Sequence, residues 1–341
     1  MNRIIVRLQN LISVERMEEY STRYFWVLPL IGFSMGWGSF LMIQRGETLA
    51  KWVATLALVG LPWILAEPFI MSRLVGGNNP RLSTLISNFI SQSIQQEIFF
   101  FTLPFLVAAT HIEDKGQLAF TLVFILAALI STVDPIYDRY VYKNRIVSLA
   151  FHSLCCFVAA LVILPIVVKL PTDETLLFAL LFVVIWLVLV LPHMLFKITG
   201  FKRKAGALLG MMAIPVCIWA FRSSIPAAGI LVSHAAITTD IINNEPANEL
   251  TSLSMAELAD GVYAYAAIRA PMNLSQKILF RWQHEGWVED IPAEITGGRA
   301  EGFRTYSHKQ VFVTPVDGRW DVDILTSQGQ LLQHLSFNVL P

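Results

Sequence analysis

Seven long apolar runs occupy the first two thirds of this chain, and no such run follows residue 221. They cover residues 25–43, 51–71, 88–110, 117–133, 146–168, 175–192 and 205–221. A helix of about 20 apolar residues, with a workable range of roughly 17 to 25, crosses the hydrocarbon layer of a bilayer. The runs therefore predict an α-helical membrane bundle of about seven transmembrane helices between residues 23 and 222.

Basic residues in the loops predict how these helices are oriented. If all seven runs cross, thirteen Lys and Arg residues lie on the side of the N-terminus and five lie on the other side. Loops rich in Lys and Arg face the cytoplasm in membrane proteins, so the N-terminus is expected there. An odd number of crossings then carries the chain after Arg222 to the opposite side of the membrane.

The segment before the first run, residues 1–22, is predicted to be amphipathic, because its apolar residues recur at helical spacing and its arginines fall elsewhere on the wheel. A helix on the surface of the inner leaflet is expected, and a short cytoplasmic helix without lipid contact is the alternative. In the first run, Gly32 and Gly36 lie one helical turn apart. This spacing lets two helices pack closely, and it leaves a homo-oligomer through that face open.

The third run is polar where lipid is expected. Its wholly apolar part, from Ile98 to Thr110, is too short to cross, so the helix has to extend backward through polar turns. This extension aligns Gln92 and Gln95 on one face and brings Glu97 near mid-depth. Ionisable groups at that depth are costly and mark functional sites by default.

Other polar residues are expected at comparable depth, in the half of the bundle nearer the cytoplasm. The candidate intramembrane polar site consists of Gln92, Gln95, Glu97, Glu67, Asp134, Asp138, His152 and His193. The alternative is that its charged members lie at the headgroup level and that the glutamines hydrogen-bond between helices.

No catalytic motif accompanies these polar residues. HExxH and Walker-type loops are absent from the sequence. Cys155, Cys156 and Cys217 lie inside apolar runs, where cysteine behaves as a small hydrophobic residue. The sequence therefore predicts no metal, cofactor or catalytic residue, and it favours a non-enzymatic protein.

Charge and periodicity change together after Arg222. Residues 1–222 carry 18 basic and 12 acidic residues, a balance of +6, whereas residues 223–341 carry 7 and 13, a balance of −6. Nucleic acid is not expected as a partner of this acidic part. Apolar residues there alternate with polar ones in short stretches separated by HEG, TGG, VDG and SQGQ, which predicts an all-β immunoglobulin-like sandwich over residues 223–341.

About seven strands are expected in this sandwich. They fall at residues 230–238, 262–268, 278–282, 291–295, 303–313, 320–324 and 335–339. Trp282, Trp320 and Phe337 are the expected large residues of its core. A glycine turn at Gly297 and Gly298, where positive φ angles are allowed, is expected to link the fourth and fifth strands.

Polar side chains just after this turn are a candidate binding surface. It consists of Arg299, Arg304, Ser307 and Lys309, which suit an anionic ligand or the acidic face of a partner. The alternative is that Arg304 forms an ordinary cross-strand charge pair with Asp321 or Asp323. His308 and His334 show no spacing to a nucleophile that would predict a hydrolase.

The segments GVYAYAAIRAP, ILFRWQHEG, GGRAEGFRTYSHK, GRWDVDILTSQGQLL and SFNV follow one another between about Asp260 and Val339. In this order they resemble the bacterial domain-of-unknown-function family 2914, a sandwich-like domain found at the end of membrane proteins. The part before it is similar to the membrane family numbered 5924. The resemblance implies this architecture and a bacterial origin, and it implies no activity, substrate or cofactor.

Together these features predict three segments: residues 1–22, the helical domain 23–222 and the β domain 223–341. The expected protein is a multi-pass protein of the bacterial inner membrane, with a periplasmic β domain that binds a periplasmic protein or a small ligand. The competing hypothesis is a transporter or intramembrane enzyme that uses the polar residues of the third helix.

Overall fold

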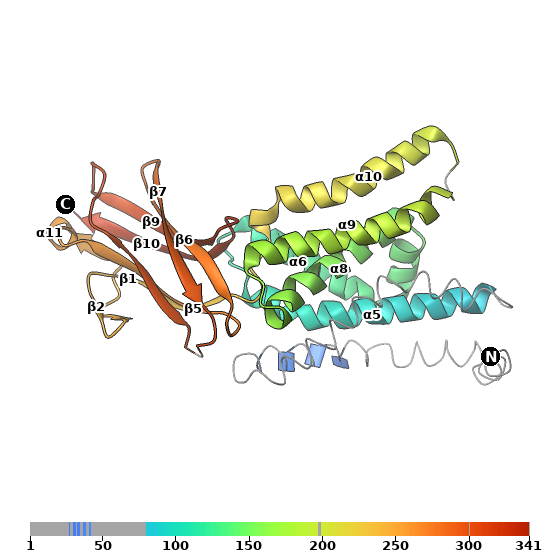
Figure 1. Ribbon diagram of the computed structural model, residues 1–341, viewed down its shortest axis with the longest axis horizontal. Helices are drawn as coiled ribbons and strands as arrows, with labels where there is room; N and C mark the ends of the chain where they lie inside the picture. Colours follow the sequence, from blue (N-terminus) through green and yellow to red (C-terminus); the bar gives the residue numbers. More distant parts are fainter. Residues whose placement is uncertain are drawn as a thin grey trace.

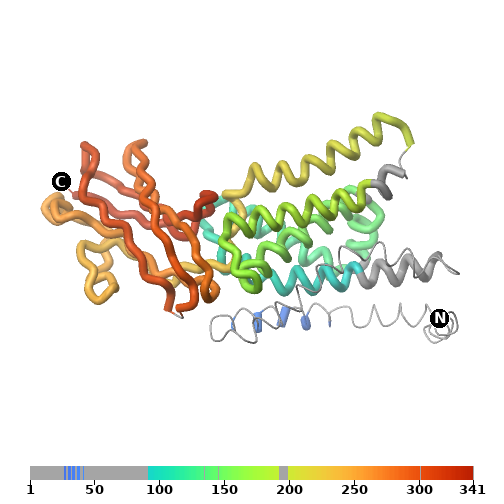
Figure 2. The backbone as a smooth tube through the Cα atoms, viewed as in Figure 1, coloured from blue at the N-terminus to red at the C-terminus, as the bar shows by residue number. Residues whose placement is uncertain are grey.

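The computed structural model describes residues 80–196, 199–299 and 301–340, together with eight isolated positions between residues 27 and 41. Within these residues, helices fill the chain up to residue 220, and strands dominate from residue 231 onward. The helices lie side by side along one axis, and the strands lie beyond one end of them, so the molecule is elongated (Figure 1). The backbone tube in Figure 2 shows the same division into a helical part and a β region.

Two helices of the helical part begin just after a short polar side chain that accepts hydrogen bonds from the free backbone N–H groups of their first turn. Asp114 accepts from the backbone N–H groups of Gly116 and Gln117, in the helix that begins at Lys115. Asn144 accepts from the first N–H groups of the helix that begins at Arg145. The elements are α5 (Pro80–Ala108), α6 (Lys115–Thr132), α7 (Asp134–Ile136), the π-helix η1 (Tyr137–Tyr142), α8 (Arg145–Val167), α9 (Thr172–Phe196), α10 (Phe201–Ala220) and the 3-10 turn η2 (Arg222–Ser224).

The central helix of this part is α8. In the apolar segment of α8, 72% of the residues are buried inside the protein, whereas this share is 33% in α6 and in α9 and 6% in α10. The outward side chains of α10 are nevertheless apolar, with Leu209, Met212 and Val216 all exposed. Because soluble proteins rarely expose so large an apolar face, lipid is the natural cover for it.

Four helices of the described residues are long and apolar enough to cross a membrane: Lys115–Thr132, Ile146–Val167, Thr172–Leu191 and Phe201–Ala220. They coincide with the fourth to seventh expected spans and suggest a membrane protein. The third expected span lies in α5, which is a continuous helix but is not among these four, because polar residues fill its first half. The second expected span, residues 1–22, and Gly32 and Gly36 lie outside the described residues, and only the eight isolated positions of the first expected span are described. The part of the chain that the structure describes therefore does not support a count of seven.

The β region consists of two principal sheets. One has the strand order β1-β5-β8, with β1 (Leu231–Thr238), β5 (Val262–Arg269) and β8 (Phe303–Lys309) all antiparallel. The other has the order β4-β10-β9-β6-β7, with β4 (Ser252–Ser254), β6 (Ser275–His284), β7 (Trp287–Thr296), β9 (Gly318–Thr326) and β10 (Leu331–Leu340). A small ribbon of β2 (Ile241–Ile242) and β3 (Glu245–Pro246) and the short helix α11 (Met255–Leu258) complete it.

All seven expected strands are present, at β1 and β5 to β10. The fifth ends at Lys309 and not at residue 313. The expected glycine turn is also confirmed: β7 ends at Thr296, β8 begins at Phe303, and Gly298 has a φ of +110°. A side chain at Gly297 would lie 2.0 Å from the carbonyl oxygen of Pro271, so only glycine fits there.

One apolar core lies between the two sheets. It contains Ala264 and Ile268 of β5 together with Trp282, Trp320 and Phe337 of the larger sheet, each fully or almost fully buried. The three aromatic residues expected in the core are therefore confirmed. The Trp282 and Phe337 rings meet edge to face, with centroids 6.3 Å apart.

The two parts of the chain are joined by hydrogen bonds from buried glutamines. The Gln117 amide of α6 donates to the Leu331 carbonyl over 2.9 Å, and the Gln330 amide donates to the Ile225 carbonyl over 2.6 Å. On the opposite side of the junction, the Gln276 side-chain oxygen accepts from the first backbone N–H of α9. Since buried amides are costly to leave unpaired, these bonds fix the β region against the helix ends.

Candidate functional site

The first candidate, the intramembrane polar site, is only partly assembled. Gln92 and Gln95 are buried on one face of α5, as predicted, and His152 of α8 contacts Gln95. The Gln95 amide nitrogen lies 2.6 Å from His152 Nδ1, and the Tyr137 hydroxyl donates to the Gln95 oxygen over 2.8 Å. The Gln95 amide therefore links Tyr137 to His152 in one hydrogen-bonded chain.

The sequence analysis did not identify several members of this cluster. Tyr137 belongs to the π-helix, a local distortion that is frequent at functional sites. Ser131 lies in the last turn of α6, and its carbonyl accepts from the amides of both Gln92 and Gln96. The indole of Trp186 stacks on His152 with an interplanar angle of 11°. The sequence signal for the inward face was the helical spacing of Gln92 and Gln95.

The prediction that Glu97 belongs to this cluster is wrong. Glu97 is exposed, because it follows Gln96 by one residue, about 100° further around the helix, and so leaves the buried face. Asp138 is also exposed, on the π-helix. The side chains of Asp134 and His193 and all of Glu67 lie outside what the structure describes.

The second candidate, the binding surface on β8, does not form one surface. Ser307 and Lys309 are buried between the sheets, whereas Arg299 is exposed over the ring of Phe303. Arg304 points to the other side of the strand. Side chains alternate between the two faces of a strand, so residues 304 and 307 could not share a face.

Each of these residues has an internal partner. Arg304 forms ion pairs with Glu245 and Glu301, and not with Asp321 or Asp323, which belong to the other sheet. The Ser307 hydroxyl accepts a hydrogen bond from the Trp282 indole over 3.0 Å.

Lys309 is almost completely buried, with 3% of its side chain exposed. Its ammonium lies 2.5 Å from a Glu289 oxygen and 4.1 Å from the centre of the Trp287 ring, with three further aromatic rings within 6 Å. Lys309 is therefore part of the core and not of a surface.

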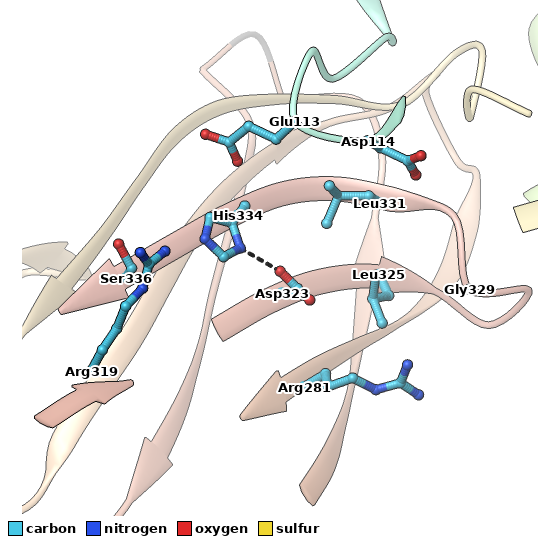
Figure 3. A pocket seen from close by; sticks show the side chains of 10 residues that line it. All are labelled: Glu113, Asp114, Arg281, Arg319, Asp323, Leu325, Gly329, Leu331, His334 and Ser336. Carbon is cyan, nitrogen blue, oxygen red and sulfur yellow. Dashed lines mark hydrogen bonds and ion pairs between the residues drawn. The ribbon is translucent and has the colours of Figure 1, made fainter. Parts of the chain in front are cut away.

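A pocket of about 710 Å³ lies where the helices meet the outer face of the larger sheet. Glu113 and Asp114, from the loop between α5 and α6, form one wall (Figure 3). Strands β6, β9 and β10 form the other. This volume falls within the range of roughly 300 to 1,000 Å³ that is usual for ligand pockets.

Strand register arranges the sheet wall in rows. Leu325 and Leu331 pair across β9 and β10 at the helix side, and next to them Arg281, Asp323 and His334 form a charged row across three strands. The sheet wall of the pocket is therefore apolar toward the helices and charged away from them. No periodicity argument predicts this, because the outward residues of the three strands read as ordinary polar positions.

The residues of this row form ion pairs and hydrogen bonds with one another and with neighbouring side chains. His334 Nδ1 lies 2.6 Å from Asp323 Oδ1, and its Nε2 lies 3.5 Å from Asp321 Oδ1. Arg281 makes a two-bond contact with Asp290 at 2.7 and 2.8 Å. This contact raises the pKa of Arg281 and lowers the pKa of Asp290, so both stay charged.

Neither a hydrolase nor a metal site follows from these groups. Ser336 lies in the pocket but makes no hydrogen bond with His334 in the part of the chain that is described, so no nucleophile and base are assembled. Among the same described residues, no group of three or more His, Cys, Asp or Glu could hold a metal ion. What the pocket offers is binding through both signs of charge.

Two family models match the chain. The model described as "Family of unknown function (DUF5924)" matches residues 5–264, and the model described as "Protein of unknown function (DUF2914)" matches residues 275–339. The first match runs past the helices through β1 to β4 and into β5, and the second begins at β6, later than the expected start near Asp260. No curated protein and no solved structure matches the chain.

Proposed function

Since the chain belongs to the family of unknown function DUF5924 and ends in a DUF2914 match, we propose its function from the geometry of the junction between its two parts. The protein is a membrane-anchored ligand-sensing module. Its β region binds a ligand in the junction pocket, and its helices anchor the module and relay the bound state. The observation that carries this proposal is that the two walls of the pocket come from different parts of the chain.

The β9–β10 hairpin is the relay that the contacts support. Its strands carry Asp323, Leu325 and His334 of the pocket, while its turn is bonded to the helix ends. Arg222, just after α10, donates to Gln328 over 3.1 Å, and Gln330 is bonded to the same segment. A ligand that prefers one position of this hairpin therefore biases the ends of α6 and α10.

An immunoglobulin-like sandwich is the fold that the strand order favours. In chain order, β1, β5 and β8 correspond to strands A, B and E, and β6, β7, β9 and β10 correspond to C, C′, F and G. Trp282 on β6 takes the place of the buried tryptophan of strand C. Domains of this shape commonly bind partners, which agrees with a sensing role.

We also propose seven membrane helices in a bacterial inner membrane, with the N-terminus in the cytoplasm and the β region in the periplasm. The helix ends far from the β region carry a cluster of basic residues: Arg139, Lys143, Arg145, Lys202, Arg203 and Lys204. The ends that face the β region carry Lys115, Lys169 and Arg222 and also four acidic residues. This distribution supports a cytoplasmic location for the far ends.

Reporter fusions test this orientation. Alkaline phosphatase fused after Pro341 is expected to be active and green fluorescent protein at the same place to be dark, because the first needs the periplasm and the second folds poorly there. The same reporters inserted after Lys143 serve as the matched control and should give the opposite result. Fluorescence from the C-terminal fusion would contradict the proposed orientation.

The competing function is a transporter or intramembrane enzyme. The hydrogen-bonded chain of Tyr137, Gln95 and His152 is the observation that favours it, since buried polar networks inside membranes often serve transport. The exposed Glu97 weakens it, because the one carboxylate of α5 does not reach the chain.

Complementation separates these functions. In a strain that lacks the protein and shows a growth or envelope phenotype, Ser336→Trp is expected to abolish complementation, because an indole on this exposed position fills the pocket without entering the core. Deletion of residues 226–341 should also abolish it. Leu340→Trp is the matched control: it places the same side chain four positions further along β10, on an exposed position outside the pocket, and should complement fully.

Membrane levels of each variant are compared by immunoblot. Full complementation by Ser336→Trp would overturn the sensing function. Loss of complementation by Glu97→Gln or Gln95→Leu, with Ser336→Trp intact, would support transport instead.

A further inference from the structure

Two residues of the junction pocket, Glu113 and Arg319, carry opposite charges and have atoms that can bind a ligand. Glu113 is exposed and makes no hydrogen bond or ion pair within the described residues. The nearby His111 does not neutralise it, because burial is the main influence on His111 and lowers its pKa, so it is uncharged at pH 7. A cationic group entering the pocket would meet an uncompensated carboxylate.

Arg319 supplies the opposite charge. Within the part of the chain that the structure describes, it is bonded to Asp321 through Nε alone, at 2.8 Å, so both terminal nitrogens of its guanidinium can bind a ligand. Its side chain is 63% exposed. Figure 3 shows Glu113 on the loop over His334, and Arg319 reaching toward Ser336 on the opposite wall. The guanidinium geometry suits a phosphate.

The position of the pocket relates it to the bilayer. Asp114 is the residue directly before α6, one of the four helices able to cross a membrane, so Glu113 and Asp114 lie at the end of a candidate span. Ile112, next to Glu113, is 78% exposed. The apolar row of Leu325 and Leu331 lies on the same side, toward the helices. A ligand here would have its polar end away from the helices and its apolar end toward them.

We propose that the ligand of this pocket is a zwitterionic phospholipid whose headgroup joins a primary ammonium to a phosphodiester, a choice that rests on the sensing function proposed above. Glu113 binds the ammonium, Arg319 binds the phosphate, and the acyl chains leave past the leucine row toward the helices. Phosphatidylethanolamine has this chemistry.

Other headgroups fit the pocket less well. A quaternary ammonium such as choline is recognised by the faces of Trp, Tyr or Phe, and none of these lines the pocket among the residues that the structure describes. A headgroup without an amine leaves Glu113 unpaired next to the added negative charge of its phosphate. The primary ammonium donates hydrogen bonds to a carboxylate, which a trimethylated one cannot do.

Native mass spectrometry of the full-length protein, released from detergent with equal amounts of phosphatidylethanolamine, phosphatidylcholine and phosphatidylglycerol, tests the proposal. We expect preferential retention of phosphatidylethanolamine. Glu113→Gln and Arg319→Gln should each weaken its binding about three- to tenfold, the loss of one charge-assisted contact at a partly exposed site. Glu174→Gln is the matched control: it makes the same change on an exposed residue at the same end of the helical part, outside the pocket, and should leave binding unchanged.

Equal retention of the three lipids, or equal behaviour of Glu113→Gln and Glu174→Gln, would overturn the proposal. Water-soluble glycerophosphoethanolamine is added as a competitor at the lipid concentration. If it displaces the lipid completely, the free headgroup is the ligand and the membrane is excluded as its source. If Ser336→Trp abolishes complementation while lipid binding shows no preference, the sensing function stands and only the lipid is wrong.

Discussion

Replacing Trp282 by alanine is expected to lower the free energy of unfolding of the β region by about 3–5 kcal/mol, the usual cost of removing a large aromatic residue from a core. Trp282 is fully buried between the sheets, so the surrounding strands cannot collapse into the space that it leaves. The substitution also removes the donor to the buried Ser307 hydroxyl. Amide hydrogen exchange of β5, β6 and β9 in the full-length protein measures the change.

Two further variants serve as comparisons for Trp282→Ala. Trp282→Phe keeps an aromatic ring against Phe337 and should cost less than the alanine variant. Phe201→Ala removes an aromatic residue of α10 that is 87% exposed, and it should leave exchange in the β region unchanged. Unchanged protection of β6 in Trp282→Ala would mean that this residue is not at the centre of the core.

Lys309 is expected to behave as a core residue with a charge at its end. Lys309→Ala should destabilise the β region by about 2–4 kcal/mol, because it leaves a cavity among the rings of Trp282, Trp287 and Trp320. Lys309→Met keeps most of the volume and removes the charge, so it should stay within about 1 kcal/mol of the natural protein. The same exchange measurement compares them.

The partner of Lys309 provides the converse test. Glu289→Gln leaves a buried ammonium without an anion and is expected to cost about 1–3 kcal/mol, although the Glu289 side chain is itself 45% exposed. The expected order is therefore Lys309→Ala most damaging, Glu289→Gln next and Lys309→Met least. If Lys309→Met were as damaging as Lys309→Ala, the ion pair and not the packing would stabilise this position.

The elements of the fold were largely predictable because they depend on local patterns. Apolar runs of membrane length became α6, α8, α9 and α10, and period-two alternation became all seven expected strands. The Gly297–Gly298 turn followed from residue type alone, since glycine adopts a conformation that other residues avoid. The third run was harder, because its glutamines lower the apolar signal while α5 continues through them.

The candidate sites were predicted less well, because composition does not say which way a side chain faces. Glu97 and Gln96 are neighbours in the sequence, yet one is exposed and the other buried. Arg304 and Ser307 were grouped by their chemistry, but the alternation of β8 separates them. Gln95 was placed correctly, although its partners Tyr137 and His152 come from elements 42 and 57 residues away.

The sequence by itself determined the type of the long helices and of the seven expected strands, because helix and strand formation respond to the spacing of apolar residues a few positions apart. Only the tertiary structure decided that Glu113 faces His334 and Arg319 across a pocket, since these residues are distant in the chain and meet through the packing of a loop on a sheet. The register of β6, β9 and β10 sets the charged row, and the buried glutamines at the junction hold the loop above it. These are long-range contacts, and no local pattern encodes which partner a strand or a loop will find.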